Sequence, residues 1–130
     1  MIIDSSVLVA IVKDEPEAPV FEQIMQNSDQ ALRMSAANWF EAAIVADGMR
    51  IAELSLRFDR IVERASLEIV AVTPEHATIA RDAYRAFGKG SGHKAKLNYG
   101  DCFAYALAVQ AGEPLLFNGN GFTHTDVAQA

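Results

Sequence analysis

The sequence predicts an α/β fold with a central, mostly parallel sheet of four to five strands flanked by helices. Short apolar segments suited to strands alternate with helical segments along the chain, as expected when helices connect parallel strands. The strand segments are apolar on both faces, which is typical of a sheet covered by helices on both sides. The chain has 130 residues and contains no repeat, low-complexity tract or long linker. We therefore expect a single domain covering residues 1–130.

The first half of the chain predicts two strands and four helices. The opening strand is apolar and ends at a carboxylate, and Ser5 and Ser6 are suited to cap the helix that follows. The next segments carry apolar residues at helical spacing, interrupted by one short strand-like stretch that ends at Ser35. The expected strands are residues 1–4 and 32–35, and the expected helices are residues 7–12, 17–27, 37–50 and 54–65.

The second half predicts two further strands and two long helices. β-Branched residues indicate a strand at 69–72. Thr73, Pro74 and Glu75 are typical of a helix start, because they supply a capping hydroxyl, a proline at the first position and an acid in the first turn. This helix is expected to end near residue 87, before a glycine-rich loop at 88–92. A last helix at 99–111, stopped by Gly112, leads into an apolar strand at 114–117 and a turn at 118–121.

Composition favours a globular protein of the cytoplasm. The hydrophobic share of 51% and the charged share of 22% are ordinary. The longest apolar runs, residues 7–12 and 104–109, are too short to cross a bilayer, and the basic start of a secretory signal is lacking. Cys102 is the single cysteine, which excludes an internal disulfide and agrees with a reducing compartment. We expect a cytoplasmic protein that does not contact a membrane.

The charge distribution contains one basic segment on an acidic background. The net charge of −6 argues at first against a nucleic-acid partner, because phosphates normally bind clustered Lys and Arg. Residues 83–100, however, contain no acid and carry Arg85, Lys89, Lys94 and Lys96. From charge alone a solvated loop is the simpler interpretation, and contact with RNA phosphates is the alternative.

Three carboxylates are candidates for a functional site. Ligands of parallel sheets bind outside the carboxyl ends of the strands; Asp4 ends the first strand and Asp101 begins the last helix. Each of these two also has a structural explanation, because an acid at a helix start acts as a cap or favours the helix dipole. Glu41 lies in an apolar helix surface, where a buried charge needs a cation, a hydrogen-bond donor or a raised pKa. A partly exposed glutamate at the helix edge is the alternative.

Together the three carboxylates predict a metal site. An α/β sheet can bring them to one edge, where their charges repel and, without a cation, raise the pKa of at least one of them. An all-oxygen site suits Mg²⁺ or Mn²⁺, which keep several waters and accept phosphate oxygens from a substrate. Such an ion activates a water and stabilises the leaving oxygen of a phosphodiester. It also allows an acidic protein to accept a polyanion.

The sequence resembles the VapC-type PIN-domain toxins over essentially its whole length. The resemblance depends, in the family's order, on the Asp-x-Ser end of the first strand, the Glu41 helix, the segment 98–108 and the strand 114–117. It implies a PIN-like three-layer sandwich. It also implies a ribonuclease toxin that uses Mg²⁺ or Mn²⁺, commonly forms a homodimer and is held inactive by a cognate antitoxin. By the same resemblance Asp4 and Asp101 are metal ligands. Glu41 is then the third acid, which holds the metal directly or through water, and Ser6 supports the first aspartate.

The turn after the last strand departs from the family's pattern. The family usually continues with Phe-Lys-Gly-x-Asp-Phe and then Thr-Asp, whereas residues 117–122 read Phe-Asn-Gly-Asn-Gly-Phe here. Asn118 stands in place of the lysine and Gly121 in place of a fourth acid, for which Asn120 or Asp126 are candidate replacements. Two alternatives to a toxin therefore stay open. One is a housekeeping RNA-processing PIN nuclease, and the other is a catalytically weakened PIN domain that binds RNA or an antitoxin.

Three further patterns are set aside. The loop after residue 88 lacks the spacing of a P-loop and follows a helix rather than a strand. His76, His93 and His124 do not have the spacing of a zinc motif. Cys102 has no partner for a histidine-based triad, and we interpret it as a small buried residue.

Overall fold

The computed structural model describes all residues 1–130 and contains six α-helices around a four-stranded sheet. The strands are β1 (Ile2–Ile3), β2 (Arg33–Ser35), β3 (Glu68–Val70) and β4 (Leu115–Leu116). The helices are α1 (Ser5–Val12), α2 (Ala18–Gln26), α3 (Ala36–Gly48), α4 (Ala52–Arg64), α5 (Pro74–Phe87) and α6 (Tyr99–Ala111), and a short 3-10 helix, η1, covers Phe122–His124. All neighbouring strands are parallel, in the order β3-β2-β1-β4, so the predicted parallel sheet is confirmed.

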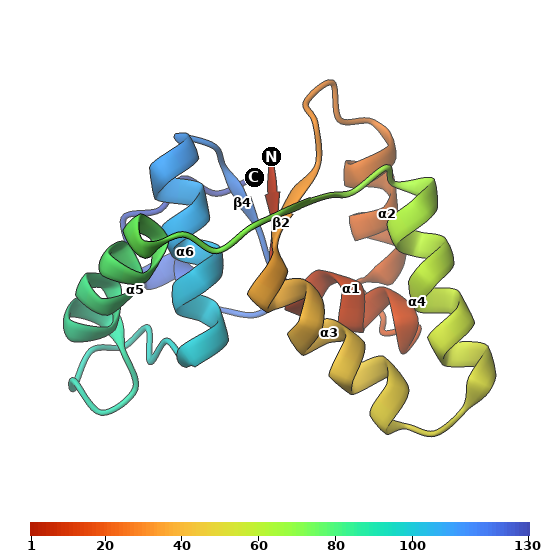
Figure 1. Cartoon of the computed structure of the whole chain (residues 1–130), viewed down its shortest axis with the longest axis horizontal. Coiled ribbons are helices and arrows are strands. Elements are labelled where there is room, and N and C mark those ends of the chain that lie inside the picture. The colour runs from red at the N-terminus through yellow and green to blue at the C-terminus, as the bar shows by residue number, and fades with distance from the viewer.

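Helices cover both faces of the sheet and give three layers. Figure 1 shows α1 to α4 on one side and α5 and α6 on the other. The first side holds a cluster of 18 buried apolar residues and the second a cluster of 14, so neither face of the sheet is left without a core. Ile3 belongs to the first cluster and Ile2 to the second, because successive side chains of a strand point to opposite faces. The central strand β1 therefore joins the two cores.

The parallel sheet determines where a ligand site can form. β1 leads directly into α1 and β2 directly into α3, so the starts of these two helices lie at the same edge of the sheet. Helix α6 packs against α3 and against the strands, which brings its first turn toward that edge. This carboxyl edge is where α/β sheets of this kind bind their ligands.

Two local predictions are wrong. Helix α1 begins at Ser5, and its cap is Asp4, whose carboxylate accepts a hydrogen bond from the backbone N–H of Ser6; aspartate caps helices as well as serine does. The third strand is Glu68–Val70 rather than residues 69–72. It is an edge strand with Ile69 39% exposed, so its β-branched residues do not reflect burial on both faces.

The predicted ends of the last two long helices are confirmed. Thr73 caps α5 by accepting from the backbone N–H of His76, and Pro74 is the first helical residue. His76 is buried and its Nδ1 accepts from the backbone N–H of Thr73, so this histidine completes the cap. Helix α6 ends at Gly112, which has a left-handed φ of 66° as glycine at this position favours. No helix of the chain has both the length and the apolar character needed to cross a membrane.

Candidate active site at the carboxyl edge of the sheet

Asp4 is the most deeply buried carboxylate of this edge, with only 2% of its surface exposed. Its Oδ2 accepts two hydrogen bonds from Ser6, one from the backbone N–H at 3.0 Å and one from the hydroxyl at 2.5 Å. Its Oδ1 is buried and has no hydrogen-bond partner. Buried oxygens are normally paired, and each exception requires an explanation. Asp4 therefore presents one free oxygen to the interior of the site.

Ser6 holds Asp4 in place from a fixed position. Its Oγ accepts a hydrogen bond from the backbone N–H of Asn118 at 2.9 Å while it donates to Asp4. The loop after β4 thus determines where the hydroxyl proton points. The side chain of Asn118 extends further and donates to Glu15 at 3.3 Å. This arrangement agrees with the predicted supporting role of Ser6, which stays a prediction.

Glu41 projects from the second turn of α3 and is held by donors. Ser5 Oγ donates to its Oε2 at 2.7 Å, and the Asn38 amide approaches the same oxygen at 3.4 Å. The same amide donates to the carbonyl of Gly100 at 2.9 Å, which ties α3 to the first turn of α6. Glu41 thus has the donors that its apolar surroundings require, although it is only partly buried.

The Glu41 carboxylate lies directly against Gly100. A Cβ added at Gly100 would fall 2.4 Å from both Glu41 carboxylate oxygens, so a larger residue there would displace the Glu41 side chain from its present position. From the sequence alone, Ser5 had only a helix-capping role, and Asn38 and Gly100 had no role in the site. Asn38 carried a usable signal, because it is a polar residue three positions before Glu41 on an otherwise apolar helix, and it is completely buried.

Asp101 lies in the first turn of α6. It caps this helix and also keeps one carboxylate oxygen free of the cap. Asn98 and Asp101 form a capping box, in which each side chain accepts from the other residue's backbone N–H at 2.8 Å. Only Oδ2 of Asp101 takes part in this pair. The second oxygen accepts no hydrogen bond, so the capping role does not exclude a ligand role.

Charges of neighbouring acids contribute to a raised pKa at both Asp4 and Asp101. Burial raises the pKa of Asp4 from 3.8 to about 6; the two hydrogen bonds from Ser6 act against this shift, and the charges of Asp101 and Glu41 add to it. Burial also raises the pKa of Asp101; the Asn98 backbone bond lowers it and the charge of Glu41 raises it. Burial, with a further contribution from Asp101, raises the pKa of the neighbouring Cys102 thiol to about 11, so this thiol stays neutral at physiological pH.

The oxygen atoms available here fit a hard divalent cation. Asp4 has a buried oxygen without a partner, and Asp101 has an oxygen outside its cap. No group of three or more carboxylate, histidine or thiol side chains is arranged to hold a metal ion. Mg²⁺ needs only one or two carboxylates, because it keeps several waters. The residues present therefore fit Mg²⁺ or Mn²⁺ held by Asp4 and Asp101, with Glu41 acting through water.

Nothing in the turn after β4 supplies a fourth carboxylate. Gly121 has an ordinary φ of −58°, and a Cβ added there would lie 3.3 Å from the carbonyl oxygen of Ala95. The carboxylate of Asp126 accepts from the Tyr105 hydroxyl at 2.6 Å and does not contribute to the charge that raises the pKa of Asp4. Asn120 is exposed. A role for either candidate as the replacement of the fourth acid stays a prediction.

The basic segment lies along the chain that leads into this site. Arg85 is near the end of α5, and Lys89, Lys94 and Lys96 follow in the connection to α6, seen at the lower left of Figure 1. All four side chains are exposed, and none belongs to one of the chain's ion pairs. Their contact with RNA stays a prediction.

Comparison with known proteins identifies the family of this chain. The sequence pattern of the PIN domain matches residues 1–128. This chain belongs to the PIN-domain family. The predicted resemblance is thereby confirmed, and the three-layer sandwich with its parallel sheet is the PIN fold.

Curated relatives of this PIN domain carry VapC names and match it from end to end. Ribonuclease VapC28 of Mycobacterium tuberculosis is 45% identical over 130 residues, which is 100% of this chain and 97% of the relative. Ribonuclease VapC30 of the same species is 47% identical over 129 residues, covering 98% and 96% of the two chains. Such identity over the full length assigns the chain to the VapC-type members.

Solved structures share the fold of this PIN domain at low sequence identity. Mycobacterium tuberculosis VapC20, a toxin that cleaves the sarcin-ricin loop, superposes with a TM-score of 0.76 at 11% identity, covering 99% of this chain and 97% of that one. A toxin–antitoxin complex from Klebsiella pneumoniae contains a chain that superposes with a TM-score of 0.72 at 15% identity, covering 99% and 95%. At these identities the likeness concerns the fold alone.

Proposed function

We propose that this chain is a divalent-metal-dependent endoribonuclease and the toxin of a toxin–antitoxin pair. Full-length relatives named as VapC ribonucleases support the reaction class. The observation that supports the site most directly is the unpaired, buried Oδ1 of Asp4 beside two further acids. A protein that needed Asp4 only as a helix cap would have no reason to bury a second oxygen without a partner.

The residues have distinct parts in the proposed reaction. Asp4 and Asp101 hold a Mg²⁺ or Mn²⁺ ion, which supplies an activated water and charge stabilisation for the phosphodiester. Ser6 orients Asp4 through its hydroxyl, and Ser5 and Asn38 orient Glu41. Glu41 orients a water by a hydrogen bond or accepts a proton from it as a general base. The basic segment at residues 85–96 holds the RNA backbone against the site.

The proposed partners follow from the same assignment. A cognate antitoxin is supported by the toxin–antitoxin complex from Klebsiella pneumoniae, one chain of which shares the fold of this chain. We also propose that the chain forms one domain over residues 1–130, works in the cytoplasm and assembles as a homodimer. A small reading frame encoding a DNA-binding amino-terminal half immediately upstream in the genome would support the antitoxin. Its absence would favour a housekeeping RNA-processing nuclease.

A second candidate function is a binding module of weak catalytic power. It is favoured by one observation, the lack of a fourth carboxylate at Gly121 together with the engagement of Asp126 by Tyr105. Such a protein would bind RNA or an antitoxin with the same surface and cleave slowly.

The deciding experiment measures RNA cleavage by the purified chain with Mg²⁺ or Mn²⁺ and maps the new RNA ends. Asp4→Asn and Asp101→Asn should abolish cleavage. Asp59→Asn, which neutralises an exposed acid on α4, is the matched control and should retain it. Cleavage that survives both site substitutions would assign the activity to a contaminant or to another site. RNA binding without cleavage in the parent chain would favour the binding module.

A further inference from the structure

A groove between α5 and α6 lies beside the carboxylate site and is not used by it. Its volume is about 560 Å³, which is within the range of ligand sites, roughly 300–1,000 Å³. One wall is the face of α5 that carries Arg81 and Tyr84. The other wall is the first turns of α6, with Tyr99 and Phe103, and Lys89 lies at the end of the groove.

Two aromatic rings of the groove are exposed to solvent. Tyr99 is 79% exposed and Tyr84 is 48% exposed. Phe103 packs edge-to-face against the Tyr99 ring, with 4.9 Å between the ring centres, which supports the ring from one side. The Tyr84 hydroxyl donates to the carbonyl of Lys89 at 2.8 Å and so fixes this second ring. Supported, exposed rings of this kind are the usual platforms for unpaired bases.

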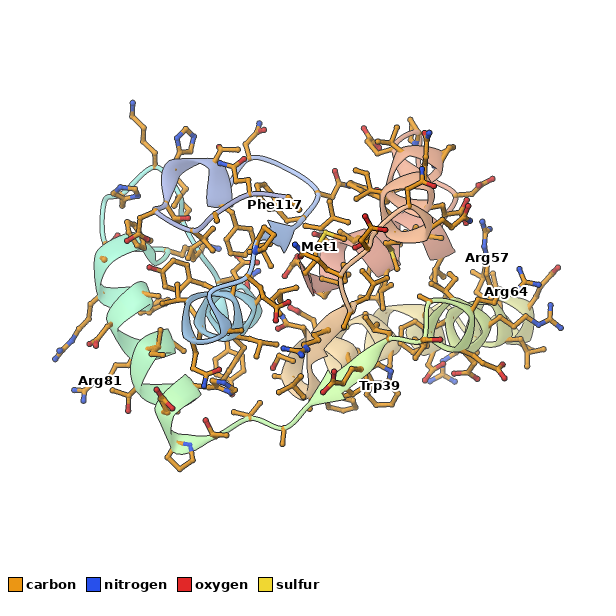
Figure 2. The ribbon with its side chains drawn as sticks, turned by 90° about the horizontal axis from the view of Figure 1, so that it is seen from above. Met1, Trp39, Arg57, Arg64, Arg81 and Phe117 are labelled. Atoms are coloured by element: carbon orange, nitrogen blue, oxygen red, sulfur yellow. The ribbon has the colours of Figure 1, made fainter.

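The charged side chains around the rings are positive, as the phosphate of a nucleotide requires. Arg81 and Lys89 are the charged residues of the groove, and no acid lines it. Neither cation belongs to one of the chain's ion pairs. Figure 2 shows Arg81 on the outer side of α5, pointing away from α6 and into solvent. Aromatic faces combined with unpaired cations fit a single-stranded nucleic acid better than an apolar peptide.

The groove and the acidic site meet at the first turn of α6. Asn98 lines the groove and forms the capping box with Asp101. Tyr99 is followed by Gly100, on which the Glu41 carboxylate rests, and then by Asp101. An RNA strand that runs from the acids along the first turn of α6 would pass the Tyr99 ring.

We propose that this groove binds one unpaired base of the RNA strand next to the phosphate that is cleaved. The base stacks on Tyr99, and the adjoining phosphates contact Lys89 and Arg81. The inference rests on the proposed function, because the occupant is the RNA substrate. It makes Tyr99 a specificity-determining residue, and it predicts that a paired, double-stranded RNA cannot use the groove.

The test measures binding of labelled single-stranded RNA oligonucleotides in a chelator at low ionic strength, so that no cleavage occurs. Tyr99→Ala should weaken binding about tenfold, since one base stacked on an aromatic ring contributes about 1–3 kcal/mol and 1.4 kcal/mol is about tenfold. Tyr99→Phe keeps the ring and should bind like the parent. Val109→Ala, an exposed residue at the other end of α6, should have no effect. Lys89→Gln should weaken binding more than Lys13→Gln, which removes an exposed lysine outside the groove.

A series of oligonucleotides, each with one base removed, then locates the partner of Tyr99. At one position the loss of the base should weaken binding as much as Tyr99→Ala does, and the two changes together should cost little more than either alone. Unchanged affinity of Tyr99→Ala for all oligonucleotides, or no RNA binding by the parent chain, would overturn the inference. So would a Tyr99→Ala protein that sediments as a smaller species with unchanged RNA affinity, because the groove would then bind a second copy of the chain.

These outcomes are separable from the fate of the proposed nuclease. Binding that depends on Tyr99, in a chain that does not cleave RNA with Mg²⁺ or Mn²⁺, supports the base site and refutes the nuclease. Cleavage that depends on Asp101, with equal KM for the parent and Tyr99→Ala, supports the nuclease and overturns the base site.

Discussion

The two edges of the sheet handle their charges in opposite ways. At the amino edge the Met1 amine binds Glu113 at 2.5 Å, and Arg33 binds both Glu113 at 2.6 Å and Glu68 at 3.1 Å. Each of these groups lies at or just before the start of one of the four strands. In the strand order, the two positive groups beside β2 and β1 therefore lie between the two acids beside β3 and β4. At the carboxyl edge Asp4, Glu41 and Asp101 stand together without a cation. The amino edge pairs its charges within the protein, whereas none of the chain's ion pairs includes an acid of the carboxyl edge.

We propose from this difference that the amino edge serves stability and the carboxyl edge serves binding. A paired charge contributes to folding, whereas a buried charge without a partner reduces the free energy of unfolding. Perturbed carboxylates gathered in one place are characteristic of functional sites. The contrast can be tested at each edge separately, because substitutions at the two edges should change stability with opposite sign.

The largest expected effect is a gain of stability from Asp4→Asn in metal-free buffer. The folded-state pKa of about 6 lies above the ordinary 3.8, so folded Asp4 holds its proton more tightly than unfolded Asp4. The contribution of protonated Asp4 to the free energy of unfolding is therefore fully present below about pH 4. This contribution is lost as the pH rises through about 6. At about pH 8 the loss amounts to about 3 kcal/mol, and Asp4→Asn should recover most of it.

Urea unfolding of parent and Asp4→Asn at about pH 4 and about pH 8 measures this effect. The two curves should coincide at the lower pH and separate at the higher one. A variant that is less stable than the parent at about pH 8 would mean that Asp4 is mainly a structural cap.

The opposite sign is expected at the amino edge. Glu113→Gln removes the anion that pairs with the Met1 amine and with Arg33. Hydrogen bonds to charged groups contribute roughly 1.5–3 kcal/mol, so the free energy of unfolding should fall by about 2 kcal/mol. The matched control is Glu68→Gln, because the Arg33–Glu68 pair is more exposed and should contribute less than about 0.5 kcal/mol. Equal small effects of the two substitutions would contradict the view of a stabilising amino edge.

A smaller effect is expected when a fourth acid is added at the carboxyl edge. Gly121→Asp restores the carboxylate of the family's pattern and should strengthen the apparent affinity for Mn²⁺ by about tenfold, or about 1.4 kcal/mol. The φ of −58° accepts an aspartate, but the Cβ contact with the Ala95 carbonyl at 3.3 Å requires a small shift of that segment. Calorimetric titration of Gly121→Asp beside Gly121→Asn separates charge from the added side chain. Equal affinities of the two variants would show that residue 121 does not face the metal.

The smallest effect concerns the basic segment. Neutralising Lys94 and Lys96 together should weaken RNA binding and flatten its salt dependence, because each lost phosphate contact lowers the slope of log affinity against log salt by about 0.7 for single strands. Binding measured over a series of salt concentrations gives this slope. An unchanged slope would return these lysines to a solvated loop.

Much of the fold could be predicted because its signals are local. Thr73 with Pro74 marks the start of α5, and Gly112 with its left-handed φ marks the end of α6. The boundaries of α1 and β3 were wrong because they depend on competition between neighbours. Asp4 and Ser5 are both good helix caps, so the sequence does not decide between them. A β-branched segment has the same sequence pattern at the edge of a sheet and in its core.

The candidate site was predictable only in part, because its contacts join distant elements. Asp4 and Asp101 could be selected from their places at a strand end and a helix start. The donors to Glu41 come from Ser5 and Asn38, and the cradle at Gly100 forms only when α6 packs on α3. The paired charges of the amino edge depend on the strand order β3-β2-β1-β4, which is a property of the whole fold.

We propose that Asp4 and Asp101 bind a divalent cation at the carboxyl edge, and a thermal unfolding titration with Mn²⁺ is a direct test. A ligand that binds only the folded state stabilises it by about 2.7 kcal/mol at a concentration one hundred times its Kd. Mn²⁺ should raise the Tm of the parent and of the control Asp59→Asn, and it should leave the Tm of Asp4→Asn and Asp101→Asn unchanged. Equal increases in Tm for all four proteins would contradict a site shared by Asp4 and Asp101.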